Sequence, residues 1–509
     1  MKKHSHSTPH NSLLLSSRIG GLIYLNPMRH SLLFFFFFFL FVFHGVLASH
    51  SSPLRFKLHR RSMPSSSRLE YLRALVIGDQ IRQGTIASRI GRPGTPLHNR
   101  RRACDSPSTD LAPAPAPGFG FAMPLNSGSY VGEGQFFALF RLGTPAQKLR
   151  LIIDTGSDLT WVKCLAPRRL HPGGGGGGKG KHKGKGWNFK PQASSSWHPI
   201  TCSSDMCKTS LPDALVACPT PASPCLYEYG YEDGSMAKGF FANESATISL
   251  SNGRKAKLKR LVVGCTTSTA GPSFFASDGV LALGFSRISF TMAAAPHFGG
   301  RFSYCLVDHL SPRNRTGYLT FGPNPAFPQA SSPTSPPPFS STHLLLTPHF
   351  EPWYAVSVAA ISLDGVILPV PQNIWDVEQG GGVIVDSGTS LTMLVEPLYT
   401  AVVTVLSERL ERIPRTNMDP FEYCYNWTTG AADNVVIPKL AVHFADSARF
   451  EPPSKSYVID VAVGVKCIGF QPAPWPGQST IGNILQQEHH WEFDIRNKRL
   501  RFKPDKCTS

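Results

Sequence analysis

The longest apolar run of the sequence, near the N-terminus, is short for a membrane span, and no later run is apolar enough to cross a lipid bilayer. None of its 11 cysteines forms a pair with the C-x-x-C spacing that is typical of a structural zinc site. Long stretches of helical periodicity are rare, because 44 prolines and 45 glycines interrupt the chain. These absences argue against a helical membrane protein, a zinc module and a helical bundle, and they favour a mostly β protein with many turns.

The formal net charge of +18 is concentrated in segments that contain almost no acidic residues. Residues 1–48, 49–102 and 163–190 hold 24 of the 51 Lys and Arg residues but only two of the 33 Asp and Glu residues. The remainder of the chain, with 27 basic and 31 acidic residues, is mildly acidic. Because a nucleic-acid-binding fold carries its positive charge on the body of the domain, we expect no nucleic-acid partner.

Residues 1–48 have the pattern of a secretory signal peptide. Four basic residues precede the apolar stretch "SLLFFFFFFLFVF", and the small residues of "GVLAS" follow it, which predicts cleavage near Ala48. A signal anchor that stays in the membrane is the alternative. The final "RFKPDKCTS" is not a hydrophobic tail, so we expect no stable membrane anchor and a secreted protein.

Secretion into an oxidising compartment favours disulfide bonds between the cysteines. Cys104 stands apart in a Pro- and Ala-rich stretch, which leaves an even number in each half of the chain. The two groups are Cys164, Cys202, Cys207, Cys218, Cys225 and Cys265, followed by Cys305, Cys424, Cys467 and Cys507. Zinc binding is the alternative, which the spacing disfavours.

Residues 49–120 form a basic segment that precedes the β-rich part of the chain. It contains the helical-looking stretch "SSRLEYLRALVIGDQIRQGTI" and ends in three consecutive arginines beside a Pro-rich linker. This arrangement predicts a pro-segment and linker that are removed by processing, although the processing site is not fixed by the sequence. A disordered spacer is the alternative. The Gly- and Lys-rich insertion at residues 171–186 is expected to be a solvated loop, unless it binds an acidic surface.

Two short motifs repeat the same order of residue types 232 positions apart. In "LIIDTGS" Asp154 follows three aliphatic residues, and in "VIVDSGT" Asp386 does the same. One such motif is weak evidence, but two at this separation predict duplicated lobes that bring both carboxylates together across a cleft.

Two carboxylates a few ångström apart share a proton, because ionising both is unfavourable. The ionised carboxylate can then deprotonate a water while the protonated one donates to a carbonyl oxygen, so peptide hydrolysis here needs no metal or cofactor. The hydroxyls of Ser157 and Thr389 can bond the outer carboxylate oxygens. Gly156 and Gly388 let backbone amides approach.

Over roughly residues 120–507 the sequence resembles the pepsin-like aspartic proteases, most closely their plant nepenthesin-type subgroup. The matching catalytic motifs are Asp154-Thr155-Gly156-Ser157 and Asp386-Ser387-Gly388-Thr389. The stretch "YGYEDGSMAKGFF" resembles the flap hairpin, with Tyr231 as the flap tyrosine and Trp161 as its support. The cysteines between residues 202 and 225 resemble the cysteine-rich insertion of this subgroup.

The resemblance implies an all-β, bilobal pepsin-like fold with a cleft between two related lobes. The N-terminal lobe, residues 121–300, would carry the first aspartate, the flap and the insertion, and residues 301–509 would form the C-terminal lobe. The implied disulfides are Cys164–Cys265, a nested pair Cys202–Cys225 and Cys207–Cys218, then Cys305–Cys507 and Cys424–Cys467.

The implied activity is that of a monomeric aspartic endopeptidase that hydrolyses polypeptide substrates at acid pH. The basic pro-segment would act as an intramolecular inhibitor, because it has cations to place against an ionised carboxylate pair. Its location would be the apoplast, with the vacuole as the alternative. Asn243, Asn314 and Asn426 begin Asn-x-Ser/Thr sequences and are expected to carry glycans.

Three departures from the family pattern are present: Glu232 at the flap tip, Ala282 in place of a glycine behind the first motif, and the insertion at residues 171–186. The first two are expected to lower activity if they have any effect. The main alternative keeps the fold without the catalysis, as in secreted relatives that inhibit glycanases or bind ligands in the cell wall. Both aspartate motifs and the flap are present here, which favours the protease. The signal segment and the glycosylation sequences argue against a plastid protease that binds nucleic acid.

Overall fold

The computed structural model describes residues 68–90, 120–127, 134–164, 188–211, 217–231, 235–271, 274, 276–312, 314–324, 326–327, 339–432 and 434–507. All of them belong to one compact unit, Pro53–Ser509. Several sequence predictions concern positions outside the described residues. These are the signal peptide, the three arginines, Cys104, the Gly- and Lys-rich insertion, and Glu232 with the flap turn.

The first half of the described chain is built almost entirely from strands that belong to one 19-stranded sheet. They are β1 (Phe121–Ser127), β2 (Phe136–Leu142), β3 (Gln147–Asp154), β4 (Trp161–Lys163), β5 (His198–Pro199), β6 (Leu226–Gly230), β7 (Met236–Ser249), β8 (Lys255–Ala270) and β9 (Gly279–Ala282). The short helix α3 (Phe290–Phe298) follows, and Ser289 caps it by accepting a hydrogen bond from the amide of Met292.

The second half adds ten strands to that sheet and forms two smaller ones. The added strands are β10 (Arg301–Cys305), β11 (Gly317–Phe321), β12 (Ser340–Leu345), β13 (Tyr354–Val356), β16 (Val383–Val385), β17 (Thr392–Val395), β24 (Phe470–Ala473), β25 (Ser479–Ile481), β26 (His489–Asp494) and β27 (Arg499–Pro504). One small sheet comprises β14 (Val358–Leu363), β15 (Val366–Ile367), β20 (Leu440–Phe444) and β21 (Arg449–Phe450). The other comprises β18 (Arg415–Met418), β19 (Phe421–Asn426), β22 (Val458–Ala462) and β23 (Val465–Ile468). Helix α4 (Glu396–Arg409) lies between β17 and β18 in sequence.

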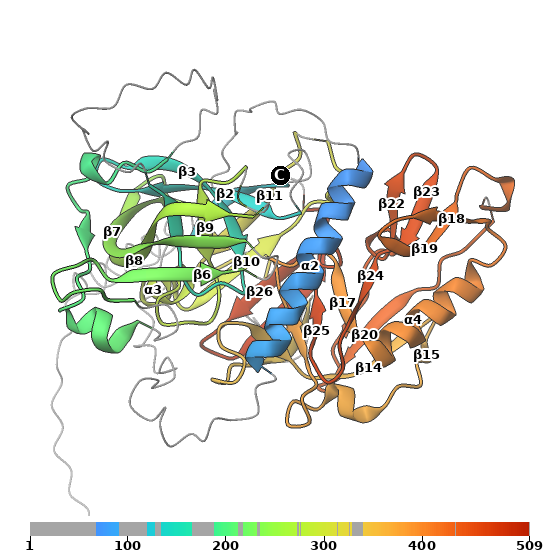
Figure 1. The fold of residues 1–509 in the computed structure, drawn as a ribbon. Coiled ribbons are helices and arrows are strands. Elements are labelled where there is room, and N and C mark those ends of the chain that lie inside the picture. The colour runs from blue at the N-terminus through green and yellow to red at the C-terminus, as the bar shows by residue number, and fades with distance from the viewer. Residues whose placement is uncertain are drawn as a thin grey trace, which may run out of the picture. The chain divides into compact units, whose positions relative to one another are not determined.

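The strand pairings of the two halves repeat each other. In the first half β3 pairs antiparallel with β2 and parallel with β9, and β4 pairs antiparallel with β9 and parallel with β8. In the second half β16 pairs antiparallel with β13 and parallel with β25, and β17 pairs antiparallel with β25 and parallel with β24. The predicted all-β fold with two related lobes is therefore confirmed. In Figure 1, the strands β7 and β8 of the first half lie on the left, and the strands β18, β19, β22 and β23 of the second half lie on the right.

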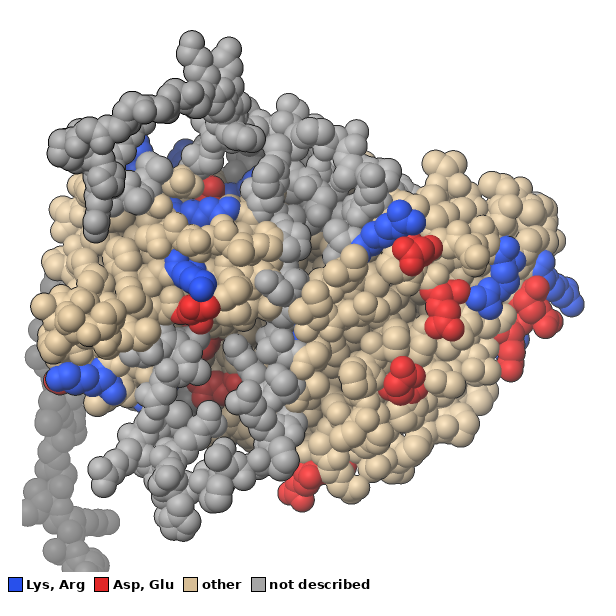
Figure 2. Space-filling model, in the orientation of Figure 1, with Lys and Arg blue, Asp and Glu red and all other residues tan. Residues whose placement is uncertain are grey.

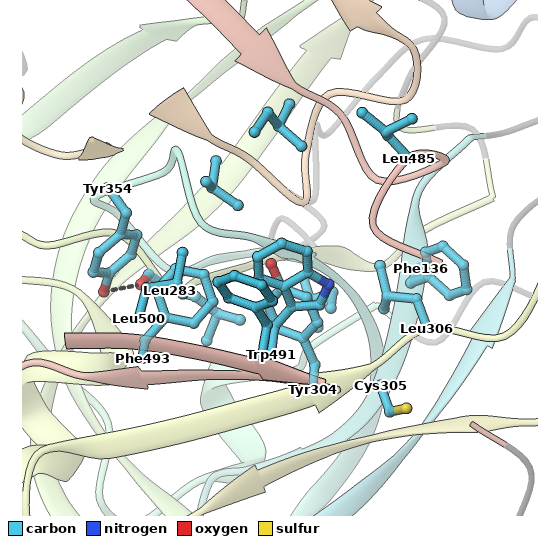
Figure 3. Packing of buried hydrophobic residues seen from close by; sticks show 14 of the residues in the cluster. Phe136, Leu283, Tyr304, Cys305, Leu306, Tyr354, Leu485, Trp491, Phe493 and Leu500 are labelled. Atoms are coloured by element: carbon cyan, nitrogen blue, oxygen red, sulfur yellow. Dashed lines mark hydrogen bonds between the residues drawn. The ribbon is translucent and has the colours of Figure 1, made fainter. Parts of the chain in front are cut away.

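Aromatic side chains pack together across the strands β10, β13 and β26. Phe302 stacks on Phe493 with ring centroids 4.7 Å apart, and Phe493 also packs against Tyr354 at 4.7 Å. The Tyr354 hydroxyl donates a 2.8 Å hydrogen bond to the Leu283 carbonyl oxygen, which ties β13 to the end of β9 (Figure 3). Such large rings contribute most of the buried apolar area in a core of this kind.

The long N-terminal helix that the sequence predicts is present as α2 (Arg68–Ile90). It contacts β17, β22 and β24, and Figure 1 shows it in blue beside these strands. Leu72, Leu75 and Val76 pack into an apolar cluster with Leu391, Phe421, Val461 and Ile484. Nearer its C-terminal end, Ile86 and Ile90 pack against Phe350, Trp353, Ala355 and Ile384. The helix therefore packs against the second lobe through two separate apolar clusters.

Five disulfides link the ten cysteines of the two groups, each within its own half. Cys164–Cys265, Cys305–Cys507 and Cys424–Cys467 form as predicted. The nested pairing predicted in the insertion was wrong, because the structure joins Cys202 to Cys218 and Cys207 to Cys225. Since all three sulfurs of the Cys202, Cys207 and Cys218 cluster are in disulfides, they offer no thiolate to a zinc ion.

The backbone of the insertion explains the crossed pairing. The amide of Cys202 donates to the Ser223 carbonyl oxygen, and the amide of Cys225 donates to the Ile200 carbonyl oxygen. Cys202 and Cys225 are therefore diagonal neighbours on antiparallel segments, where β-carbons stand too far apart for a disulfide. The π-helical turn Met206–Ser210 brings Cys207 to Cys225 instead.

Charged side chains of both signs are interspersed on the face shown in Figure 2. Among the described residues, none of the helices is long and apolar enough to span a membrane.

The crossed pairing can be tested by mapping disulfides in the non-reduced protein. Cleavage before Asp205 separates Cys202 from Cys207, and fragmentation of the linked peptides then distinguishes Cys218 from Cys225. We expect Cys202–Cys218 and Cys207–Cys225, because only these pairs are within bonding distance. Recovery of Cys202 bonded to Cys225 would show that the described geometry of the insertion is incorrect.

Candidate active site

The two predicted aspartates lie at the ends of equivalent strands, each on a tight turn. Asp154 ends β3, and its Oδ1 and Oδ2 accept hydrogen bonds from the Gly156 amide (2.9 Å) and the Ser157 hydroxyl (2.7 Å). Asp386 follows β16 directly and accepts from the Gly388 amide (3.0 Å) and the Thr389 hydroxyl (2.7 Å). The two turns thus hold their carboxylates in the same way, as the sequence predicts.

Reciprocal hydrogen bonds join the two turns across the lobes. The amide of Thr155 donates to Oγ of Ser387 (3.1 Å), and the amide of Ser387 donates to Oγ1 of Thr155 (2.8 Å). Oγ1 of Thr155 also donates to Oδ1 of Asp386 at 3.2 Å. Because Thr155 and Ser387 are fully buried, these bonds fix the distance between the carboxylates without help from solvent.

Glycine is required in both turns because the opposite lobe approaches closely. A β-carbon on Gly388 would lie 2.2 Å from Oδ1 of Asp154, and one on Gly156 would lie 2.7 Å from Nε1 of Trp353. Neither contact is sterically possible for a larger residue without movement of the catalytic motif. The spacing that lets the carboxylates meet therefore depends on these two glycines.

Strands β6 and β7 form the hairpin that the sequence predicts as the flap. The amide of Tyr231 donates a 2.7 Å hydrogen bond to the carbonyl oxygen of Ser235, which closes the hairpin on either side of the undescribed turn. Nε1 of Trp161 donates a hydrogen bond to the Tyr231 hydroxyl, and the two rings are 6.3 Å apart. Burial raises the pKa of Tyr231 well above its ordinary value, so the hydroxyl remains protonated. The predicted pair Trp161 and Tyr231 is thus assembled.

Arg82 of helix α2 reaches both aspartates at once. Its Nη2 lies 2.9 Å from Oδ1 of Asp154 and 2.6 Å from Oδ2 of Asp386, and its Nε donates to the latter oxygen at 2.8 Å. The arginine side chain is 10% exposed and the Asp386 side chain 0%. The sequence predicts that cations of this segment face the carboxylates, and the structure identifies Arg82 as the residue that does so.

The pKa values of the two carboxyl groups are displaced in opposite directions. Burial alone would raise the pKa of Asp154, but the charge and hydrogen bonds of Arg82, together with Ser157 and Gly156, hold it below its ordinary value. For Asp386, burial and the neighbouring charge of Asp154 outweigh Arg82 and raise the pKa. The pair therefore holds one proton most readily on Asp386.

Two neighbours of Arg82 on the helix bind the second lobe through polar groups. The carboxylate oxygens of Asp79 accept hydrogen bonds from the amides of Ser390 (2.9 Å) and Leu391 (2.5 Å). Burial raises the pKa of Asp79 to about 7, although these amides and Arg82 act in the opposite direction. The Gln83 amide donates to the Gln478 carbonyl oxygen and accepts from the Thr480 hydroxyl at 2.8 Å.

A signal for Arg82 and Asp79 is present in the helical pattern, although sequence reasoning missed it. The buried residues of α2 recur at helical spacing: Leu72, Leu75, Val76, Asp79, Arg82, Gln83, Ile86 and Ile90. Two charged residues and one amide thus occupy the stripe that an amphipathic helix normally fills with apolar side chains. Buried charges on such a stripe need partners, which here are the two catalytic-motif turns.

The remaining predicted positions have ordinary surroundings. Ala282 is buried and pairs with Asp154 in the parallel register of β3 and β9, so its methyl lies beside the first motif. Asn314 is exposed, whereas Asn426 is half-buried and its Oδ1 accepts hydrogen bonds from Thr428. Asn243 is half-buried within β7. A lower activity caused by Ala282 and the attachment of glycans to the three asparagines both remain predictions.

Comparisons with known proteins agree with this geometry. A family model described as "Xylanase inhibitor N-terminal" matches residues 136–323, and one described as "Xylanase inhibitor C-terminal" matches residues 353–504. Aspartyl protease family protein 2 of Arabidopsis thaliana is 32% identical over 413 residues, which are 80% of this chain and 78% of that protein. Aspartic proteinase nepenthesin-2 of Nepenthes gracilis is 27% identical over 382 residues, covering 74% and 79%. The crystal structure of basic 7S globulin from soybean has the same fold, with a TM-score of 0.56 at 18% identity, covering 76% and 95%.

The reciprocal hydrogen bonds between the turns can be tested with Thr155→Val, which keeps the shape of the side chain. The change leaves the buried amide of Ser387 without its acceptor, so we expect the free energy of unfolding to fall by about 1–3 kcal/mol. Chemical denaturation of the variant and the parent measures this. Thr220→Val, at an exposed turn, is the control and is expected to change stability by less than about 0.5 kcal/mol. Equal stability of Thr155→Val and the parent would contradict the structural role assigned to these bonds.

Proposed function

This chain belongs to the plant family of pepsin-like, atypical aspartic proteases, and we propose that it is a secreted aspartic endopeptidase active at acid pH. The observation that carries the proposal is the convergence of Asp154 and Asp386 on matched turns, with hydrogen bonds to all four carboxylate oxygens. Ten of the chain's cysteines are paired in disulfides, which supports passage through an oxidising compartment.

The proposed reaction uses one proton that the two carboxyl groups share, because ionising both is unfavourable. Of Asp154 and Asp386, the ionised one is the base that removes a proton from the attacking water, and the protonated one donates to the carbonyl oxygen of the scissile peptide bond. Tyr231, held by Trp161, closes the hairpin over a polypeptide substrate. The protein thus supplies both the acid and the base of this general acid–base hydrolysis, and solvent supplies the attacking water.

Helix α2 is proposed to keep the protease latent until it is removed. The guanidinium of Arg82 bonds to both carboxylates and occupies the position between them that a water needs. The lowered pKa of Asp154 means that this ion pair stabilises docking of the helix above the ordinary aspartate range, about pH 3.9. The stabilisation is lost as the pH falls through the lowered pKa, because protonated Asp154 no longer attracts the arginine.

The raised pKa of Asp79 acts with the opposite sign. Below about pH 7 the docked helix binds a proton on Asp79, which removes the cost of burying that charge and favours docking. Acid release of the helix is therefore expected to depend on Asp154 and Arg82, and to occur only well below neutral pH.

A second candidate function is a pepsin-fold binding or inhibitor protein of the cell wall with weak or no catalysis. The descriptions of the two matching family models favour it, because both name xylanase inhibitors. Both aspartates, both glycines and the tyrosine of the hairpin are present in this chain, which supports the protease instead. Measuring proteolysis and xylanase inhibition with the same preparation separates the two functions.

We expect Asp386→Asn to abolish cleavage of a denatured protein at acid pH, in the chain that begins at residue 121. Asparagine keeps the size of the side chain but cannot donate or accept the catalytic proton, so kcat is expected to fall by roughly 10⁴-fold or more. Tyr231→Ala is expected to leave a weaker activity. Asp364→Asn is the control, since Asp364 is exposed in the β14–β15 turn. Cleavage by Asp386→Asn at the parent rate would leave the binding-protein function as the better one.

We expect Arg82→Met to make the full-length chain active at about pH 5, where the parent is latent. Methionine keeps the helix and most of the side-chain volume but leaves the two carboxylates without their cation. Initial rates of protein cleavage by the parent and the variant across pH measure the effect. Arg73→Met is the matched control, because Arg73 of the same helix pairs with Asp419 at the surface. Equal latency of parent and Arg82→Met would contradict inhibition by α2.

A further inference from the structure

We propose that strands β2, β3, β7 and β8 of the first lobe carry a cationic surface that binds an acidic polysaccharide, a polymer whose negative charge comes from carboxylate groups. The proposal goes beyond the proposed function, because binding at this surface requires neither the catalytic aspartates nor the cleft. A secreted protein with such a surface is retained where the polymer is, instead of diffusing freely.

The surface is formed by two stretches of chain that are rich in cations and contain no acidic residue. Residues 134–150 and 245–271 together hold eight Lys and Arg residues and no Asp or Glu. This concentration is local, since the chain outside its three basic segments has 27 basic and 31 acidic residues. Glu244, just before the second stretch, is only 1% exposed and accepts hydrogen bonds from Ser194 and Ser196. The cations therefore meet solvent without a neighbouring surface carboxylate from either stretch.

A β-bulge directs two successive cations of β8 to solvent. The register with β7 shifts between Glu244 and Ala246, and Arg260 has a φ of 59°, which residues other than glycine rarely adopt. In a regular strand Lys259 and Arg260 would point to opposite faces, but here both are exposed. The other exposed cations of β8 and the turn before it are Arg254, Lys255 and Lys257. From Lys255 to Arg260 the row extends over roughly 17 Å.

Strands β2 and β3 add cations that face one another. Arg141 and Lys148 lie directly opposite in the antiparallel register. Like charges in this position are unfavourable in the free protein, and an anion bound over both removes that cost. The backbone of Lys190 and the side chain of Gln147 exchange two hydrogen bonds of 2.9 Å, which place a third exposed cation beside this pair.

The two groups of cations belong to one face of the sheet. Ala246 of β7 pairs with Leu142 of β2 on one side and with Leu258 of β8 on the other, and these three residues are buried. Arg141 and Lys257 each precede one of the two leucines, so their side chains lie on the opposite, solvent-facing side. Nζ of Lys257 also donates a hydrogen bond to Oγ1 of Thr144 in the β2–β3 turn, which connects the two groups directly.

The residues between the cations indicate the chemistry of the ligand. Ser249 and Thr247 of β7 pair with Lys255 and Lys257, so hydroxyl groups alternate with ammonium groups across the strands. Residues 245–271 contain no aromatic residue on which a nucleic-acid base could stack. The exposed large apolar side chains of the described residues lie elsewhere, in α2 and the second lobe, so none is available here to insert into a lipid surface. Cations and hydroxyls together suit a polymer that carries both carboxylates and hydroxyls.

The test measures binding of the full-length protein to polygalacturonate at about pH 6, where carboxyl groups with an ordinary pKa of about 4 are ionised. One variant combines Lys255→Gln, Lys257→Gln and Lys259→Gln. The matched control combines Lys439→Gln, Lys498→Gln and Lys506→Gln, which remove the same charge from exposed positions of the second lobe. We expect the first variant to bind about tenfold more weakly than the parent and the control to bind less than about threefold more weakly. Its affinity is also expected to fall less steeply with salt, because fewer counterions are released.

Fully methyl-esterified polygalacturonate and vesicles of anionic phospholipid are the comparison ligands. The ester lacks the negative charge, so we expect the parent to bind it at least about tenfold more weakly. Equal affinities of the two triple variants, or equal binding of the parent to the ester, would overturn the proposal. Tighter binding to the vesicles than to polygalacturonate would overturn it in favour of a membrane ligand. Equal unfolding temperatures of parent and variants show that the fold is retained. Because no step requires proteolysis, failure of this proposal and failure of the protease function are separate results.

Discussion

Burying two carboxylates beside each other is the constraint on which the rest of this structure depends. Each loses its hydration, and each raises the cost of ionising the other. The protein compensates with hydrogen bonds from two matched turns and from Thr155 of the opposite lobe. Because both turns must supply these donors in a fixed geometry, the lobes have to be joined rigidly, which the reciprocal bonds of Thr155 and Ser387 achieve.

The same constraint explains why a cation of the N-terminal segment is so effective here. A guanidinium between two buried carboxylates forms hydrogen bonds to both. It also neutralises the negative charge of the carboxylates, which the hydrogen bonds of the turns stabilise only partly. Docking of α2 also satisfies groups some distance from the pair, through Asp79, Gln83 and two apolar contacts. In the proposed scheme the whole helix thus contributes to latency. The pH dependence of latency comes mainly from the titration of Asp154.

The fold and most of the site could be predicted from the sequence because the signals are local. A strand followed by Asp, a small residue and Gly needs only a few residues to be recognised, and its repetition predicts the second lobe. The cysteine pairing in the insertion could not be predicted, since it depends on which residues face each other across two short antiparallel segments. The contact of Arg82 with the carboxylates could not be predicted either, for a different reason. Residues 49–102 contain twelve basic residues, and only the helical register shows which of them lies on the buried stripe.

The helical register limits which changes of length the segment tolerates. Successive residues of an α-helix are separated by about 100° around the axis, so inserting or deleting one residue between Leu72 and Arg82 would turn the arginine away from the carboxylates. Point substitutions on the exposed side of α2 leave its orientation unchanged. The composition of the exposed side of α2 can therefore change without loss of docking, whereas docking requires a constant number of residues between the apolar contacts of the helix and Arg82.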